Sequence, residues 1–141
     1  MLRSFALLAI LAAQAFAAPV PKEQSRSDEK MILGLWEVTA FSRDGAEIAR
    51  GKNTLIWRFE ADAKAAQMNP TDTAATFKLL PNKGFDWKTE GYDYRGLYEL
   101  RGDVLKIVIS TDDDLTRPKR LEPGANINYY EFKRVKPEDK K

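Results

Sequence analysis

The sequence contains neither cysteine nor histidine among its 141 residues. The lack of cysteine excludes disulfide bonds, even in an oxidising compartment, and also the lipid-modified cysteine of a lipoprotein. Histidine is the commonest general base, cysteine is a common nucleophile, and both are usual metal ligands. A glycine-rich phosphate-binding loop is missing as well. We therefore expect a protein that is not an enzyme, with no catalytic residues, no metal and no cofactor.

An excess of charge of one sign is also missing. The chain has 23 basic and 21 acidic residues, which gives a formal net charge of +2, and the two signs are interspersed. Recognition of nucleic acid or of an anionic membrane surface needs clustered basic residues. We therefore expect no nucleic-acid partner and no polybasic membrane patch.

No apolar run is long enough to cross a bilayer as a helix, which takes about 20 residues. Residues 1–17 have a basic start at Arg3, an apolar stretch over 5–13 and a small residue at Ala17, which is the pattern of a secretory signal peptide. We expect cleavage after Ala17 or Ala18, with an uncleaved anchor as the alternative. The mature protein would be secreted or periplasmic, without a membrane span.

Composition divides the remaining chain into three parts. Residues 18–30 are polar, contain two prolines and show no hydrophobic periodicity, so we expect a flexible tether. Residues 31–136 form one candidate domain, and a charged tail follows at 137–141. A domain of this size buries about 60 to 70% of its unfolded surface, which is enough for one core without disulfide bonds.

Apolar and polar residues alternate with a period of two through most of this domain, which is typical of strands with one buried face. Leu55, Trp57 and Phe59, for example, share one face of a predicted strand. The same pattern predicts eight strands, at 34–42, 54–60, 63–68, 74–80, 85–89, 95–100, 104–110 and 127–135.

The connections between these strands favour antiparallel hairpins. Turn-forming residues stand at 44–45, 82–84 and 101–103. The spacers are too short for parallel crossovers, which need a dozen or more residues. A meander of this many twisted strands loses its exposed edges when it closes on itself. The predicted fold class is all-β: a small antiparallel meander β-barrel of about eight strands.

Four stretches of the domain resemble a known family. Together they are similar to a lipocalin-like domain family that occurs in many copies in planctomycetes and whose members are mostly uncharacterised. The resemblance covers about residues 32–134, and its stretches are GLW at 34–36, DG at 44–45, GLYELRGDVLKI at 96–107 and RPKRLEPG at 117–124. It implies a lipocalin-like barrel that binds a small apolar ligand.

The resemblance also implies a structural role for the GLW stretch. In lipocalins the tryptophan of the G-x-W motif plugs the closed end of the barrel and lies against an arginine near the end of the last strand. By this resemblance Trp36 stacks on Arg134, a contact that contributes about 0.5 to 2 kcal/mol. Gly34 lets the backbone pass close by without a side chain.

A set of aromatic residues falls on the inward-facing positions of the predicted strands. These rings could line an apolar ligand cavity or fill the barrel as core, because an eight-stranded barrel has room for side chains or one small ligand. The ligand-lining candidates are Trp57, Phe59, Phe77, Trp87, Tyr98 and Phe132. The alternative function is an interaction module with a packed interior, which binds a cell-envelope protein or a glycan through its outer surface or loops.

Two other stretches have both a functional and a structural interpretation. The run from Asp112 to Asp114 offers carboxylates to calcium, but no spaced series of ligands follows it, so a solvated loop is favoured. Residues 84–95 mix aromatic and basic residues, as protein interfaces do. The alternate positions of Phe85 and Trp87 favour a hairpin with inward-facing aromatics instead.

Overall fold

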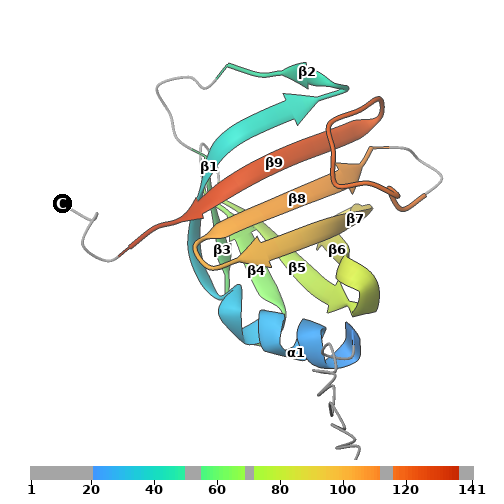
Figure 1. Ribbon diagram of the computed structural model, residues 1–141. Coiled ribbons are helices and arrows are strands. Elements are labelled where there is room, and N and C mark those ends of the chain that lie inside the picture. Colours follow the sequence, from blue (N-terminus) through green and yellow to red (C-terminus); the bar gives the residue numbers. More distant parts are fainter. Residues whose placement is uncertain (1–20, 50–54, 69–71, 112–115, 137–141) are drawn as a thin grey trace, which may run out of the picture.

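The computed structural model describes residues 21–49, 55–68, 72–111 and 116–136 (Figure 1). Within these ranges the chain forms one α-helix, one short 3-10 helix and nine strands. The helices are α1 (Pro21–Met31) and η1 (Pro81–Lys83). The strands are β1 (Gly34–Arg43), β2 (Ala46–Glu47), β3 (Ile56–Phe59), β4 (Lys64–Gln67), β5 (Thr73–Leu80), β6 (Gly84–Thr89), β7 (Tyr92–Arg101), β8 (Val104–Ser110) and β9 (Ile127–Arg134).

Eight of these strands close into an antiparallel barrel. Each strand from β3 to β8 pairs with the next one along the chain, and β1 pairs with β3 and also with β9. The short β2 is a hairpin partner for the last residues of β1. The predicted fold class, a small antiparallel meander barrel of the lipocalin-like kind, is confirmed, and the strand bounds lie within three residues of the prediction.

The tight turns lie where the turn-forming residues stand in the sequence. Asp44 and Gly45 connect β1 to β2 with positive φ angles of 51° and 79°. Both angles fall in the left-handed region that Asp-Gly tolerates in a two-residue hairpin. Gly102, in the turn between β7 and β8, also has a positive φ angle, of 56°. These local preferences help to fix the register of the two hairpins.

A β-bulge in β1 changes which of its side chains face the interior. The register with β9 shifts between Val38 and Ala40. Because a bulge inserts one extra residue into the alternation, Trp36 and Val38 before it and Phe41 after it share the inner face, and Arg43 continues that face at the exposed end of the strand. Phe41 accordingly lies against the core.

Aromatic and aliphatic side chains from all eight barrel strands fill the interior. They alternate along each strand with side chains that face solvent, as the period of two predicts. The buried cluster consists of Ile32, Trp36, Val38, Trp57, Phe59, Ala65, Ala75, Phe77, Leu79, Phe85, Trp87, Tyr98, Leu100, Leu105, Ile107, Ile109 and Phe132.

The helix α1 covers one end of the barrel (Figure 1), and it corrects the prediction of a flexible tether over residues 18–30. That prediction is wrong from Pro21 onward, because these residues form a helix that is continuous with the domain. The anchor is polar: the carboxylate of Asp28 is buried and accepts a hydrogen bond from Tyr98 Oη at 2.7 Å. A helix that docks through a carboxylate shows no hydrophobic periodicity in its sequence, which explains the error.

Several expectations fall outside the described residues: the signal peptide at 1–17, the tail at 137–141 and the acidic run at 112–114. Within the described ranges, no helix combines the length and the apolar character that crossing a membrane would require.

Candidate functional site: the barrel interior and its mouth

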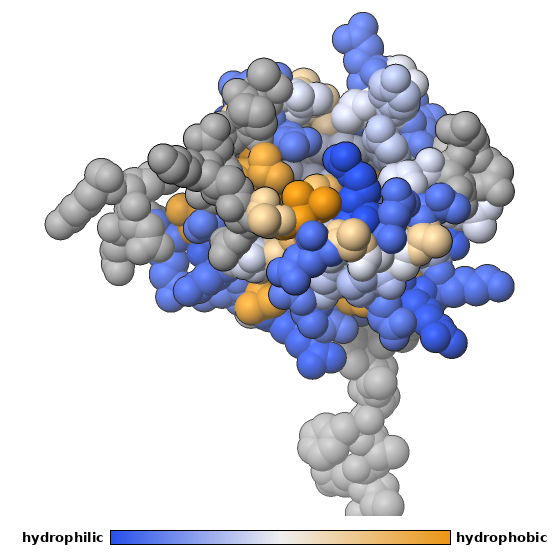
Figure 2. All heavy atoms as spheres, turned by 90° about the horizontal axis from the view of Figure 1, so that it is seen from above, coloured by the Kyte–Doolittle hydropathy of each residue, from blue (hydrophilic) through white to orange (hydrophobic). Residues whose placement is uncertain are grey.

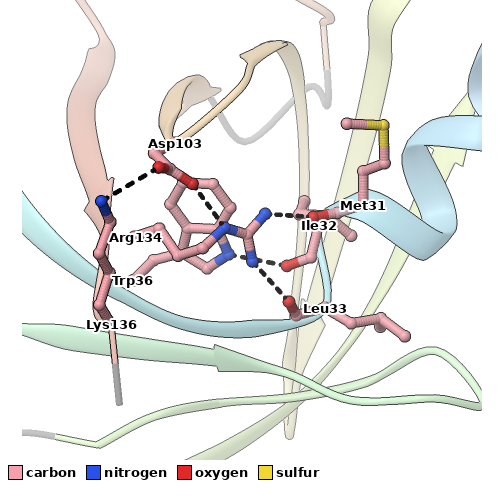
Figure 3. Close-up of polar contacts among 7 residues, drawn as sticks. All are labelled: Met31, Ile32, Leu33, Trp36, Asp103, Arg134 and Lys136. Atoms are coloured by element: carbon pink, nitrogen blue, oxygen red, sulfur yellow. Dashed lines mark hydrogen bonds and ion pairs between the residues drawn. The ribbon is translucent and has the colours of Figure 1, made fainter. Parts of the chain in front are cut away.

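The closed end of the barrel is built around Trp36 and Arg134, which the structure brings into contact (Figure 3). Trp36 is fully buried, and its Nε1 donates to the carbonyl of Ile32 at 2.7 Å. The Arg134 guanidinium lies 4.3 Å from the centre of the Trp36 ring. A Cβ at Gly34 would lie 3.3 Å from Arg134 Nη1, so glycine leaves the space that the arginine occupies.

Arg134 also joins three segments of the chain at this end. Its Nη1 donates to the carbonyl of Leu33 at 2.8 Å, and its Nη2 donates to the carbonyl of Met31. Its Nε forms an ion pair with Asp103, in the turn between β7 and β8, at 3.1 Å. The arginine thus ties the end of α1 and the β7–β8 turn to the last strand. These contacts use all three nitrogens of the guanidinium and give Arg134 a structural role.

Tyr98, one of the six ligand-lining candidates, also faces the closed end. Its hydroxyl donates to Asp28, and Lys83 forms an ion pair with the same carboxylate at 3.5 Å. Burial, and then the nearby Asp28 carboxylate, raise the pKa of Tyr98 well above its usual range. The hydroxyl therefore stays protonated and holds α1 against the barrel.

The other five candidates lie together in the middle of the barrel. Their ring centres lie 4.5 Å apart for Trp57 and Trp87, 5.0 Å for Trp57 and Phe132, and 5.0 Å for Phe59 and Phe77. Each of the six candidates, Tyr98 included, is only 1–6% exposed. The rings thus occupy much of the interior themselves, and contact between these rings and a ligand stays a prediction.

The opposite end of the barrel carries a second group of side chains, which we call the mouth cluster: Phe41, Arg43, Tyr94, Asn128 and Tyr130. Cross-strand pairing places Phe41 opposite Tyr130, and Arg43 opposite Asn128. The rings of Phe41 and Tyr130 stack at 4.8 Å with an angle of 13° between their planes. The Arg43 guanidinium lies 5.6 Å from the Phe41 ring. Figure 2 looks onto this end and shows apolar side chains gathered at its centre, with hydrophilic side chains around them.

Tyr130 connects the mouth cluster to the buried rings. Its ring centre lies 4.9 Å from that of Trp57. Burial raises the pKa of Tyr130 to about 12, while the positive charge of Arg43 and a hydrogen bond with the Asn128 side chain act in the opposite direction. The hydroxyl, the guanidinium and the amide therefore lie close enough to act on one another.

Two polar atoms near this cluster are buried without a hydrogen-bond partner in the described part of the chain: Trp57 Nε1, a donor, and Asn128 Oδ1, an acceptor. A buried polar group without a partner costs about 1 to 3 kcal/mol. Native structures normally satisfy such groups, by protein, by water or by a ligand. Both atoms thus mark places where a polar atom from outside the chain would be stabilised.

The outer wall carries two open grooves, of about 810 and 570 Å³. The larger lies between α1 and the connection from β3 to β4, and the smaller lies across β5, β6 and β7. Both are lined by side chains of both signs: Arg26, Lys30, Glu60 and Asp62 in the first, and Lys78, Asp86, Lys88, Asp93 and Arg95 in the second. Such a lining gives neither groove a preference for a ligand of one charge.

The aromatic segment at 84–95 folds as the structural interpretation predicted. Phe85 and Trp87 are 0% and 4% exposed and point into the barrel. Tyr92 is 66% exposed, so one aromatic ring of this hairpin remains on the surface. Among the residues that the structure describes, no three acidic side chains gather in a way that could hold a metal ion.

Sequence reasoning missed the mouth cluster and also Arg117. The bulge in β1 hid the inward position of Arg43, but Tyr130 was detectable, because it lies two residues before the inward-facing Phe132. Arg117 pairs with Asp86 at 2.7 Å and donates to the carbonyl of Gly96 at 2.8 Å. It fixes the connection between β8 and β9 to the outer wall.

One end plugged by Trp36 and an interior filled by aromatic rings define a small lipocalin-like barrel. No family model matches the sequence, and a comparison with curated proteins finds no match either. The function must therefore be argued from the residues of the barrel.

Proposed function

We propose that this chain is an exported, non-enzymatic protein of the lipocalin-like family named above, and that it binds a small apolar molecule at the mouth of its barrel. The signal-like pattern at 1–17 supports export. The G-x-W stretch and the block at 96–107 support the family. The absence of histidine and cysteine supports a role in binding over a role in catalysis.

One observation carries the binding proposal: Trp57 Nε1 is buried without a partner in the described part of the chain, and the Trp57 ring centre lies 4.9 Å from that of Tyr130. Protein interiors satisfy nearly all such donors, so an unsatisfied one near an opening favours an external partner. The rings around it are apolar, which suits a small molecule with an apolar body and one polar atom.

The position of the proposed site follows from what already occupies the barrel. The rings of Phe59, Phe77 and Phe132 lie deep in the interior and are 1–6% exposed. Phe41, Tyr94 and Tyr130, in contrast, are only partly buried and pack against the core from the end opposite to α1. A ligand would therefore rest on the upper rings and not pass below them.

The test is titration of the purified protein with N-phenyl-1-naphthylamine, a neutral probe whose fluorescence rises in apolar surroundings. We expect saturable binding, weakened about fivefold by Tyr94→Ser, because loss of an aromatic contact costs about 1 kcal/mol. Val104→Ser is the control: it removes an exposed apolar side chain at the start of β8, at the closed end of the barrel, and leaves the affinity unchanged.

The dense packing of the six inward rings also favours a second candidate, an interaction module that binds an envelope protein or a glycan through its outer surface or loops. A protein that melts cooperatively but binds neither this neutral probe nor a charged probe with the same aromatic body would refute binding at the mouth and support this module.

A further inference from the structure

Arg43 differs from several other arginines in having no acidic partner among the residues that the structure describes. Arg58, Arg101, Arg117 and Arg134 each form an ion pair with a carboxylate at 2.7 to 3.2 Å. In residues 21–49, 55–68, 72–111 and 116–136, no carboxylate lies within ion-pair distance of Arg43. Its guanidinium instead lies over the Phe41 ring, on the face of β1 that the bulge turns inward. An exposed planar cation is thus held at the rim of the barrel, without an ion pair to any described carboxylate.

Other hydrogen-bond donors lie below Arg43 along the same wall. Asn128 lies opposite Arg43 on β9, and Tyr130 lies two residues further along the strand, opposite Phe41. The Asn128 amide and the Tyr130 hydroxyl can each donate a hydrogen bond. Deeper still, Trp57 Nε1 is a buried donor without a partner. From the rim inward, the side chains of Arg43, Asn128, Tyr130 and Trp57 therefore all carry hydrogen-bond donors. Asn128 Oδ1 adds one free acceptor to it.

The walls of this path are flat. Phe41 and Tyr130 stack at an angle of 13°, and Trp57 and Trp87 stack at 28° with ring centres 4.5 Å apart. The rim and the Tyr130 ring are two strand residues apart on β9, which corresponds to about 7 Å. Because the rings of Trp57 and Trp87 occupy the space below Tyr130, a ligand of one aromatic ring with a short charged substituent is favoured over a long acyl chain.

From these three features we propose that the mouth selects a small planar organic anion, such as an aromatic carboxylate or sulfonate. This inference rests on the proposed function and adds the class of ligand. The flat body lies against the rings of Phe41, Tyr94 and Tyr130. The anionic group forms charge-assisted hydrogen bonds with the fork of the Arg43 guanidinium, whose geometry suits two oxygens of one acid group.

The experiment uses two probes that share one aromatic body. 1-Anilinonaphthalene-8-sulfonate carries a sulfonate, and N-phenyl-1-naphthylamine is its neutral counterpart. We expect Arg43→Gln to raise the dissociation constant of the sulfonate probe about fivefold or more, and to change that of the neutral probe by less than about twofold. We also expect sodium chloride to weaken binding of the sulfonate probe to the wild type, and to do so less in the variant.

Two further variants locate the effect. Arg101→Gln removes an arginine of the closed end whose side chain is 81% exposed, and it leaves both affinities unchanged. Arg43→Lys keeps the charge but loses the planar fork, so it falls between the wild type and Arg43→Gln. Thermal melts of all variants confirm that the fold is kept.

The outcomes separate this inference from the proposed function. If the neutral probe binds and Arg43→Gln leaves the sulfonate affinity unchanged, the preference for an anion is refuted and binding at the mouth stands. If Arg101→Gln weakens binding of the sulfonate probe as strongly as Arg43→Gln does, the anion does not bind specifically at the mouth, and the inference is also refuted. If neither probe binds the folded protein, both proposals fail.

Discussion

The buried contact between Asp28 and Tyr98 provides a quantitative test of how α1 is held. Their side chains are 2% and 1% exposed, and the hydroxyl donates to the carboxylate at 2.7 Å. A hydrogen bond to a charged group contributes about 1.5 to 3 kcal/mol to stability. Lys83 is half-exposed, so its ion pair with Asp28 adds at most about 1 kcal/mol. We therefore expect Tyr98→Phe to lower the free energy of unfolding by about 1.5 to 3 kcal/mol.

A double-mutant cycle isolates this interaction. Tyr98→Phe, Asp28→Ala and the double variant are unfolded in urea at pH 7, and unfolding is followed by tryptophan fluorescence and circular dichroism. Because the two groups contact each other directly, the losses of unfolding free energy in the two single variants should sum to at least about 1.5 kcal/mol more than the loss in the double variant. Tyr92→Phe is the matched control, since it removes the hydroxyl of an exposed tyrosine on the same strand and should cost less than about 0.5 kcal/mol.

Hydrogen exchange gives a second readout of the same contact. In the wild type, the amides of α1 should exchange nearly as slowly as those of β7, because the helix is docked on the barrel. In Tyr98→Phe the protection of α1 should fall while that of β8 is kept. Strictly additive stabilities, together with an α1 that exchanges quickly in the wild type, would show that the helix is not held in this way.

Two further predictions concern stability. Trp36→Ala removes a fully buried ring and should cost about 3 to 5 kcal/mol; an unchanged thermal melt would place the ring outside the core. Burial raises the pKa of Tyr130 from 10.0 to about 12, so its contribution is complete below pH 10 and is lost as the pH rises towards 12. At 1.36 kcal/mol per pH unit this amounts to about 2 to 3 kcal/mol. Stability in urea should thus fall less between pH 9 and 11.5 in Tyr130→Phe than in the wild type; parallel curves would argue against burial of the hydroxyl.

The barrel was predictable because its signals are local and agree with one another. The hairpin from β7 to β8 combines alternating apolar residues with a glycine that adopts a positive φ, and the predicted β8 has the observed bounds. Even the short, alanine-rich β4 followed from its neighbours. The contact of Trp36 with Arg134 came from the family resemblance, since two residues so far apart in the sequence leave no periodic signal.

The features that escaped prediction depend on contacts that no local pattern encodes. Counting in twos from Trp36 places Arg43 on the outside, and only the bulge after Val38 reverses this. The helix over 21–31 is held by the buried Asp28, whereas a periodic apolar stripe is what sequence patterns detect. The candidate site therefore lay where the alternation of the strand is broken.

The seam between β1 and β9 has a consequence for how this protein reaches its native state. It joins the first and last strands of the barrel, so its ladder of hydrogen bonds cannot form until almost the whole domain has left the ribosome. Until then β1 has an open edge, which another chain could extend. Closure is thus a late, long-range event, of the kind that slows folding. Variants that weaken the seam should therefore aggregate while they fold, even where the folded protein keeps most of its stability.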